Sequence, residues 1–423
     1  MKIKNSSFNN LTLPTLVEPA TKHYAWGQTG SDAFIPVFLK KNTGSEPWAE
    51  AWVGSHKNGT AELFLDNRKV SLNALGLKLP WLLKLLSVQE LLSVQVHPSR
   101  QRAKKIYMKE KSRDDIKTYV DANHKSELAI PITDFWVMAG FLTKDKFIER
   151  LSFYSSIYEI VKKELNILKF EHNLDCIAAL KKDIFAILMN LSQKEINKAL
   201  TPVIKQTKQN AIYKKNELNY WLLKADRIYT KNNNFDVGLF CFFLLNLIKL
   251  TPLGEAKQEI ANDALICSPG EALFIKAGEP HFYLEGVILE LMACSDNVVR
   301  IGFTPKEKNK EELLQIIDCT EKHPSIITPV INAFASRFSY RPKVDEFQVD
   351  YAIHPKNSQH TLSVSDKPTF IIIIQGRVNI SNNYDFQNNF QKGDIIYMPS
   401  GNYCFKAETK LKYFEVSQCI ELS

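Results

Sequence analysis

The stretch LLSVQVH, from Leu91 to His97, indicates a β-strand that carries chemistry. It begins with apolar residues and then alternates between apolar and polar, as a strand with one buried face does. Side chains two residues apart on a strand point to the same side. Gln95 and His97 therefore project together while Val96 faces the other way, which places two potential metal ligands on one face of the predicted strand.

Strand patterns dominate on both sides of this stretch. Residues 1–100 contain short apolar runs between glycine turns, and residues 236–305 return to the same pattern. Near the C-terminus, Thr369–Ile374 leads through a turn to Gly393-Asp394 and then to the apolar run Ile395–Met398. An apolar run, a turn, a Gly-Asp pair and another strand are typical of a small double-sheet jelly roll.

Residues 101–235 have a different periodicity. Phe147–Leu168 and Phe185–Ala199 carry apolar residues at helical spacing, so we expect an amphipathic helix over each. The most apolar run, Val237–Ile248, has 12 residues, whereas a membrane helix needs roughly 20, so a buried strand is expected there. The patterns together predict a mainly β protein with a helical insertion.

Composition indicates a globular protein with a mild positive charge. Of the 423 residues, 45% are hydrophobic and 24% are charged, with a net charge of +8. That excess favours an anionic small molecule and does not indicate nucleic acid. The seven cysteines are widely spaced without a CxxC pair, which predicts free thiols in a reducing compartment. With no apolar segment near the N-terminus to suggest a signal peptide, we expect a cytoplasmic protein without membrane contact.

Three further polar clusters accompany Gln95 and His97. They are Asp121–Glu127, Glu279-Pro280-His281 and the run from Glu290 to Lys306. Each cluster alone is compatible with a structural role: a histidine on a strand is often part of a core, and a charged run is often a turn between strands. Their chemistry, taken together, is that of a metal-assisted reaction on an anionic substrate.

The chain resembles the type I mannose-6-phosphate isomerases over roughly its first 310 residues. The matching stretches, in family order, are Tyr24–Gly27 (YAWG), Ala49–His56 (AEAWVGSH), Leu92–Pro98 (LSVQVHP), Asn123–Glu127 (NHKSE), Gly270–Ala272 (GEA), Glu279–His281 (EPH) and Glu290–Lys306. The last run and LSVQVHP are the most specific of them in combination.

This resemblance implies three domains. A cupin jelly-roll catalytic domain would take in residues 1–100 and 236–320, an α-helical domain residues 101–235, and a C-terminal cupin-like domain residues 321–423. It also implies a monomer that uses one Zn²⁺ per chain. The implied zinc ligands are Gln95, His97, Glu127 and His281.

The resemblance further implies a reaction and roles for the remaining polar residues. Mannose 6-phosphate and fructose 6-phosphate would be interconverted by proton transfer between C1 and C2 through an enediol, and the reaction would serve GDP-mannose synthesis. The implied catalytic residues are Arg300, Lys125, His124 and Glu290, and the substrate-binding residues are Ser93, Lys306 and Asp296. His124 and Glu290 both stay open as the general base, and an ion pair with Asp296 stays open as a structural role for Arg300.

Three features depart from the family pattern. Ser126 stands where the family has proline before the ligand carboxylate, and Ser99-Arg100 replaces the commoner Asp-Lys. Two Gly-Glu-Ala turns occur, at Gly254 and Gly270, and the second keeps the expected step to His281. The residues between the two turns, around Lys257–Cys267, are then an insertion.

Three other functions are less compatible with the sequence. The main alternative is a non-catalytic cupin that binds a metal or a sugar, but such a protein would be expected to lose some of the ligands. An iron-dependent cupin dioxygenase is disfavoured by Gln95, because those sites use histidine at both strand positions. A fusion with a nucleotidyltransferase is disfavoured because no glycine-rich phosphate loop is visible.

Overall fold

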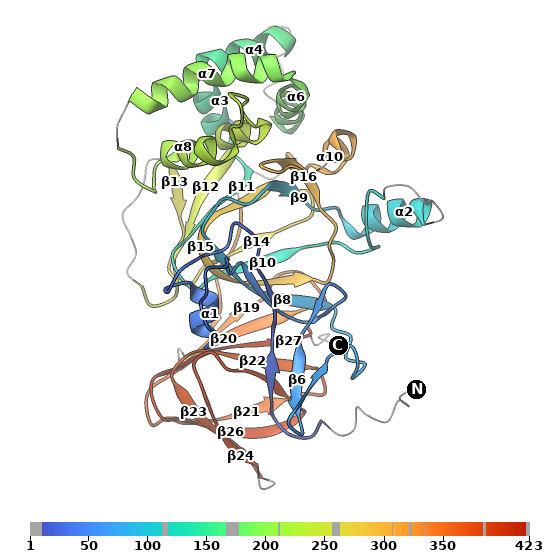
Figure 1. The fold of residues 1–423 in the computed structure, drawn as a ribbon, viewed down its shortest axis with the longest axis vertical. Helices are drawn as coiled ribbons and strands as arrows, with labels where there is room; N and C mark the ends of the chain where they lie inside the picture. Colours follow the sequence, from blue (N-terminus) through green and yellow to red (C-terminus); the bar gives the residue numbers. More distant parts are fainter. Residues whose placement is uncertain are drawn as a thin grey trace. The chain divides into compact units, whose positions relative to one another are not determined.

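The structure, a computed structural model, is drawn in Figure 1 and describes residues 11–419 except 112–116, 166–176, 210–211, 256–262, 307, 321–323, 335 and 384–385. The chain forms two compact units. The first consists of Met1–Ser87, Val287–Cys294 and Ile327–Ser423, and the second of Val88–Gly286 and Ser295–Ile326. The long strand β15 (His281–Ala293) belongs to both. The three-domain division expected from the sequence stays a prediction.

The first unit contains a two-layered β-module. One sheet has nine strands in the order β18 (Val330–Ile331), β19 (Arg337–Tyr340), β20 (Gln348–His354), β27 (Leu411–Ser417), β22 (Thr369–Gln375), β25 (Ile395–Met398), β1 (Thr15–Glu18), β6 (Glu62–Leu65) and β7 (Arg68–Ser71). The other has four, in the order β21 (Gln359–Val364), β26 (Gly401–Ala407), β23 (Arg377–Asn382) and β24 (Gln387–Gln391). Apolar side chains of both sheets form one core, which confirms the double-sheet prediction.

The same unit also holds the N-terminal strands and helix. They are β2 (Ala20–Lys22), α1 (Phe34–Phe38), β3 (Glu50–Val53), β4 (Ser55–His56), β5 (Gly59–Thr60) and β8 (Trp81–Val88). β3 pairs with both β2 and β8. β1 pairs with β25, so the start of the described chain completes the sheet of the C-terminal module.

The second unit brings short strands around the first half of β15. β11 (Phe135–Phe141) lies between β12 (Leu245–Leu250) and β15, and β9 (Val94–Val96) lies between β15 and β16 (Val299–Gly302). β10 (Glu127–Pro131) pairs with β14 (Ala272–Ile275), and β13 (Ala264–Ile266) runs parallel to β12. β17 (Ser325–Ile327) follows at the end of the unit.

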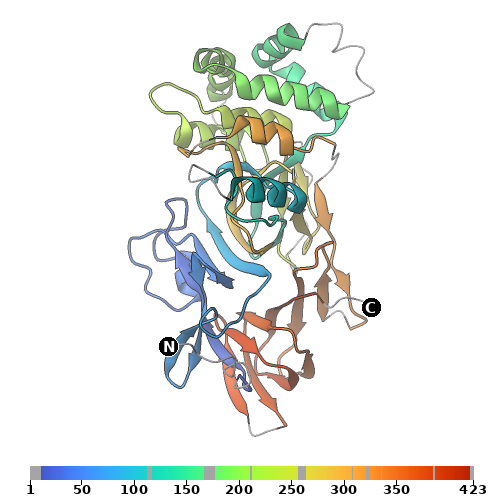
Figure 2. The same ribbon diagram turned by 90° about the vertical axis from the view of Figure 1, so that its right-hand side faces the viewer.

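The helices of the second unit gather at one end of it (Figure 2). They are α3 (Lys144–Phe153), α4 (Ser155–Leu165), α6 (Ile177–Asn190), α7 (Gln193–Gln209) and α8 (Leu218–Tyr229); α2 (Arg100–Glu110) and α10 (Lys310–Ile316) lie nearer the strands. Apolar side chains from these helices and from β9, β11, β12 and β16 form one large core. The helical insertion is therefore continuous with the core that supports β9.

Both predicted helices exist, but each is divided in two. The one expected over Phe147–Leu168 breaks at Tyr154, whose backbone leaves the helical region, and its last three residues lie outside the described ranges. The one expected over Phe185–Ala199 ends at Asn190, and Ser192 then starts a new helix. Ser192 and Glu195 exchange hydrogen bonds as a capping box, a start signal that the apolar periodicity alone does not reveal.

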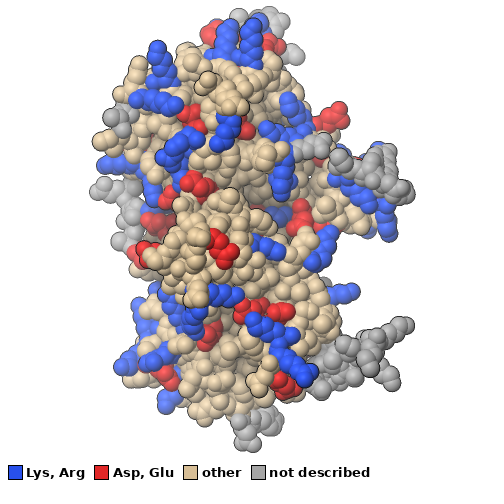
Figure 3. All heavy atoms as spheres, in the orientation of Figure 1, with Lys and Arg blue, Asp and Glu red and all other residues tan. Residues whose placement is uncertain are grey.

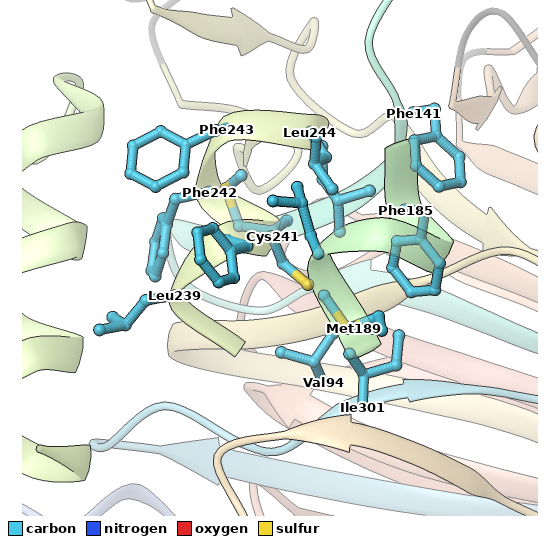
Figure 4. Packing of buried hydrophobic residues seen from close by; sticks show 14 of the residues in the cluster. Val94, Phe141, Phe185, Met189, Leu239, Cys241, Phe242, Phe243, Leu244 and Ile301 are labelled. Carbon is cyan, nitrogen blue, oxygen red and sulfur yellow. The ribbon is translucent and has the colours of Figure 1, made fainter. Parts of the chain in front are cut away.

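The buried strand expected over Val237–Ile248 is wrong for its first eight residues. Val237–Phe240 form a 3-10 turn (η3), Cys241–Leu244 form the short helix α9, and only then does β12 begin. The Asp236 carboxylate causes this start, because it accepts hydrogen bonds from the backbone N–H groups of Gly238 and Phe303, at 2.7 and 2.9 Å. Figure 4 shows the resulting turn packed among the apolar side chains of the core.

Other expectations concern the cysteines, the surface charge, membrane-spanning helices and the insertion. Six of the seven cysteines are described and all six are free thiols, as expected. On the face drawn in Figure 3, lysine and arginine side chains are interspersed with acidic ones and do not form one basic stripe. None of the helices in the described ranges is long and apolar enough to cross a membrane. Residues 256–262 of the insertion lie outside the described residues.

Candidate active site

A buried cluster of two histidines and one carboxylate lies where three strands of the second unit begin or end. His97 directly follows β9, while Glu127 and His281 are the first residues of β10 and β15. His97 Nε2 is 3.5 Å from Glu127 Oε1, and His281 Nε2 is 3.3 Å from Glu127 Oε2. All three side chains are at most 1% exposed, and one donor atom from each lies within 4.8 Å of the others.

Both histidines are oriented through their second ring nitrogen. His97 Nδ1 donates to the backbone carbonyl of Asn297 at 2.9 Å, and His281 Nδ1 donates to that of Glu279 at 3.0 Å. A neutral imidazole has one N–H, so both Nε2 atoms keep a lone pair that is aimed into the cluster. This is the arrangement that protein histidines adopt when they bind a metal.

The turn before His281 fixes its position. Gly278 has a φ of +84°, and a Cβ there would lie 2.8 Å from the backbone oxygen of Ile316. Only glycine fits this conformation and this close approach without strain. The second Gly-Glu-Ala turn behaves as expected, since Gly270 and Glu271 directly precede β14, the strand that leads to this turn.

Electrostatics show that the cluster favours a cation. Burial opposes ionisation of Glu127, but the Lys125 ammonium and His97 outweigh it and hold the pKa of Glu127 well below its usual range. Burial and Lys125 lower the pKa of His97 to about 4, so its imidazole is neutral at pH 7. Lys125 Nζ donates to Glu127 and lies 3.4 Å from His97 Nε2. It supplies the positive charge that this donor set attracts.

One oxygen of the cluster also lacks a donor. Glu127 Oε2 is buried and has no hydrogen-bond partner among the described residues, because the nearest nitrogen, His281 Nε2, is the unprotonated one. An unpaired buried carboxylate oxygen is costly. Two imidazole nitrogens and one carboxylate form a donor set that suits Zn²⁺, so these residues fit that ion.

Gln95 lies on β9, the strand that pairs with both β15 and β16. It is the register partner of His281 on β15 and of Arg300 on β16. Residues directly opposite each other on neighbouring strands have adjacent side chains on the same face. The Gln95 amide lies 3.3 Å from His281 Nε2. The structure therefore brings Gln95 together with the three other predicted ligands and places Arg300 beside it.

Arg300 faces a pocket of about 430 Å³ that Asp296 and Lys306 also line. Burial lowers the pKa of the Arg300 guanidinium, which nevertheless remains cationic at pH 7. Throughout the described part of the chain, no carboxylate pairs with Arg300. The alternative of an ion pair with Asp296 is thus not what the structure contains. Ser93 lies two residues before Gln95, just ahead of β9, and is half-buried.

His124 is held by the two residues that depart from the family pattern. Arg100 Nη2 donates to His124 Nε2 at 2.8 Å, and His124 Nδ1 donates to Ser126 Oγ at 2.9 Å. Arginine can only donate, which fixes this tautomer of the imidazole. Ser126 therefore contributes a hydrogen bond in the segment that leads to Glu127.

Glu290 lies on β15, in the part of this strand that belongs to the first unit. It is 2% exposed, and its carboxylate is 3.6 Å from Lys84 Nζ. Lys84 is itself buried, 3.8 Å from Glu50, and lies over the ring of Trp52. Glu290, the candidate catalytic residue on β15, thus lies in a group with Lys84, Glu50 and Trp52.

Sequence reasoning missed Lys84 and Asn297. Lys84 sits in the apolar run of β8, where a lysine among buried residues is an anomaly that could have revealed it. Asn297 is 1% exposed, and its side-chain amide bonds to Asp121, Asn123 and the N–H of Val120. It joins the loop before Glu127 to the backbone carbonyl that orients His97.

Known proteins match this chain along its length. The family model described as the catalytic domain of type I phosphomannose isomerase matches residues 15–144. Mannose-6-phosphate isomerase from Rattus norvegicus is 30% identical over 84% of this chain and 86% of its own length. Mannose-6-phosphate isomerase 2 from Arabidopsis thaliana is 29% identical over 90% of this chain and 87% of its own length.

Solved structures show the same fold. A variant of phosphomannose isomerase from Salmonella typhimurium superposes with a TM-score of 0.77 at 22% identity, covering 96% of this chain and all of that one. The zinc-bound form of a mannose 6-phosphate isomerase gives the same TM-score, identity and coverage. The matches extend over both units, including the cupin-like module. On these similarities and on the cluster described above, the chain belongs to the type I mannose-6-phosphate isomerase family.

Proposed function

We propose that this protein is a zinc-dependent isomerase that interconverts mannose 6-phosphate and fructose 6-phosphate. The observation that carries the proposal is the buried His97–Glu127–His281 cluster beside Arg300, whose guanidinium has no carboxylate partner among the described residues. A donor set of two neutral imidazoles and one carboxylate next to an arginine suits a reaction in which negative charge develops on sugar oxygens. The family membership supports this reaction over the non-catalytic cupin.

In this proposal Gln95, His97, Glu127 and His281 hold one zinc ion per chain. Two neutral imidazoles, one amide and one carboxylate leave a positive charge on the site. When bound there, zinc would polarise carbonyl and hydroxyl oxygens of the substrate. A divalent cation would also compensate Glu127, so that the Lys125 ammonium would be available to a substrate oxygen.

The residues around the metal then carry the proton transfer. A proton leaves C2 and another arrives at C1, and the enediol between them has oxyanion character that Arg300 is placed to stabilise. Either His124 or Glu290 moves the proton. His124 would have to exchange its bond from Arg100 for one to the substrate, whereas Glu290 is kept close to the Lys84 ammonium.

A pair of variants separates these two bases. Replacing the true base by a side-chain amide that cannot take up the proton, as in His124→Asn or Glu290→Gln, should abolish most of the turnover number while the protein still binds zinc. The other variant should retain turnover within about tenfold, since general-base catalysis contributes roughly 10²–10⁴-fold. Similar, small losses in both would contradict an assignment to either residue.

The substrate is a small sugar phosphate in this proposal. Lys306 and Arg300 supply positive charge to the pocket, and Asp296 there offers a carboxylate to sugar hydroxyls. Ser93, two residues before Gln95, offers a hydroxyl. We further propose a cytoplasmic monomer that acts without nucleic acid or membrane partners and supplies GDP-mannose synthesis. The surface charge supports the absence of a nucleic-acid partner, because basic and acidic side chains are interspersed on the face in Figure 3 and form no basic stripe there.

A coupled assay tests the main proposal. Turnover of mannose 6-phosphate is measured before and after chelation, with zinc quantified in the same samples. We expect activity in proportion to zinc and its recovery when zinc is restored. Absence of turnover in the fully zinc-loaded protein would refute the proposed reaction, and full activity without any bound metal would refute the cofactor.

A further inference from the structure

We propose that Lys117 is a specificity-determining residue, which selects phosphorylated over unphosphorylated sugars by binding the phosphate in the pocket beside Arg300. The inference rests on the proposed function and adds to it a residue that no sequence motif indicated. It starts from the lining of the 430 Å³ pocket, to which Lys117, Thr118, Asp296, Arg300, Lys306 and Asn309 contribute.

The charges of the pocket favour a dianion. Three cationic side chains, Lys117, Arg300 and Lys306, face one carboxylate, Asp296. Within the described ranges, none of the three cations has a carboxylate partner. Unpaired cations at a concave surface repel one another, so the arrangement costs free energy until an anion enters. A phosphate group with two negative charges suits this set better than a neutral hydroxyl does.

The backbone beside Lys117 is firmly held although the side chain is exposed. Thr118 donates to the Glu110 carboxylate through its N–H at 2.8 Å and through its hydroxyl at 2.9 Å. The Tyr119 hydroxyl donates to Glu312 at 2.5 Å, and the N–H of Val120 donates to the Asn297 side chain at 2.9 Å. Three successive residues are thus anchored to three different elements, which fixes the point from which Lys117 reaches the pocket.

The pocket is also joined to the metal cluster. The Asn297 side chain that binds Val120 belongs to the same residue whose carbonyl orients His97. Arg300 is the register neighbour of Gln95. A sugar phosphate with its phosphate near Lys117 and Lys306 would therefore have its remaining atoms directed past Arg300 toward the ligands.

The test compares Lys117→Gln with two matched variants. Lys117→Arg keeps the charge, and Lys109→Gln removes the same charge from an exposed position on α2 outside the pocket. For Lys117→Gln we expect KM for mannose 6-phosphate to rise by about three- to tenfold with kcat unchanged, as for loss of uniform substrate binding. Lys117→Arg should restore KM to within about twofold, and Lys109→Gln should leave it unchanged.

Binding of inorganic phosphate, followed by calorimetry on the zinc-loaded protein, gives a second measurement that needs no turnover. We expect Lys117→Gln to raise the dissociation constant for phosphate by the same factor by which it raises KM for mannose 6-phosphate. Unchanged KM and unchanged phosphate binding in Lys117→Gln would overturn this inference while turnover in the parent protein upholds the proposed function. If the parent protein has no turnover, the proposed function fails, and phosphate binding alone then decides whether Lys117 holds the anion.

Discussion

Each unit of the chain contains two histidines in ring contact, and the two pairs differ in what surrounds their nitrogens. In the second unit the rings of His97 and His281 are 5.0 Å apart and tilted, and both face the Glu127 carboxylate. In the first unit His354 and His360 are stacked 3.6 Å apart and nearly parallel. There His360 Nε2 contacts the Tyr413 hydroxyl at 3.0 Å, and no ion pair to a carboxylate is found for either ring within the described ranges.

The difference teaches that proximity of histidines does not make a metal centre. The Nδ1 atoms of His97 and His281 are occupied by backbone carbonyls, which leaves two lone pairs directed at one point. In His360 the Nδ1 atom is buried without a hydrogen-bond partner in the described structure, and Nε2 contacts tyrosine. The pair in the second unit has a shared carboxylate and backbone carbonyls that orient both rings. These features, more than the cupin-like fold itself, distinguish His97 and His281 as candidate metal ligands.

The largest effect is expected from removing one histidine of each pair. His281→Ala should lose its zinc at micromolar free metal and nearly all turnover. The loss should exceed the roughly 10–100-fold that removal of an outer hydrogen-bond partner causes, because a ligand itself disappears. His354→Ala should keep full zinc content and activity. Metal analysis with the coupled assay measures both, and a His281→Ala protein with full zinc content would contradict the ligand assignment.

The next largest effect concerns one arginine in each unit. Arg300 has no carboxylate partner in the described structure, whereas Arg337 pairs with Asp350 and Glu415 at 2.6 and 2.8 Å. Arg300→Ala should lower kcat/KM by about 10²–10³-fold without loss of stability, as for removal of one oxyanion-stabilising group.

Arg337→Ala should act in the opposite way. It removes the arginine that pairs with the largely buried Glu415 and leaves Asp350 with Arg341 as its remaining arginine partner. The free energy of unfolding should therefore fall by about 1–3 kcal/mol, with activity per folded molecule unchanged. Denaturant titration and kinetics are measured on both variants. If Arg300→Ala destabilised the protein as much as Arg337→Ala, Arg300 would be structural.

A smaller effect should follow from replacing Asn297, whose side chain supports the loop next to the cluster. Asn297→Ala removes the side chain that joins the loop at Asp121–Asn123 to the carbonyl that orients His97. We expect zinc affinity to fall by about 10–100-fold, as for loss of an outer-shell partner, with every ligand still present. Competition with a chelator measures it. Asn389→Ala, at an exposed position of β24, is the matched control and should leave the affinity unchanged.

The smallest effect should come from protonation of the stacked pair. Burial and the neighbouring His354 lower the pKa of His360 to about 3. The fold thus favours the neutral form of His360. The stability that this preference contributes is complete above the unfolded pKa of about 6.5 and is lost as the pH falls from there toward 3. Between pH 7 and pH 5 the expected loss is on the order of 1 kcal/mol of unfolding free energy, since His360 is partly exposed.

Replacement of His360 by phenylalanine keeps a stacked ring and removes the titration. The denaturation midpoint of His360→Phe should therefore fall less between pH 7 and pH 5 than that of the parent protein. An equal fall in both would show that the stacked pair does not contribute to the acid sensitivity.

Much of the fold followed from local patterns. Apolar runs separated by a turn and a Gly-Asp pair predicted the C-terminal strands, and Thr369–Ile374 and Ile395–Met398 are strands almost to the residue. Apolar periodicity found the helical region but not its breaks, since Ser192 and Asp236 act through capping hydrogen bonds. A capping residue redirects a segment whose hydrophobic pattern is unchanged, and this explains why Val237–Leu244 was misassigned.

The sequence by itself determined that Gln95 and His97 share a face, because that depends only on the geometry of one strand. Motif resemblance then supplied the identity of the remaining ligands. Only the tertiary structure decided that Gln95 meets His281, 186 residues away, and that Arg300 and Lys117 open onto one pocket, where neither has a carboxylate partner among the described residues. Sheet register and the packing of distant segments set such contacts, and neither is encoded in the spacing of neighbouring residues.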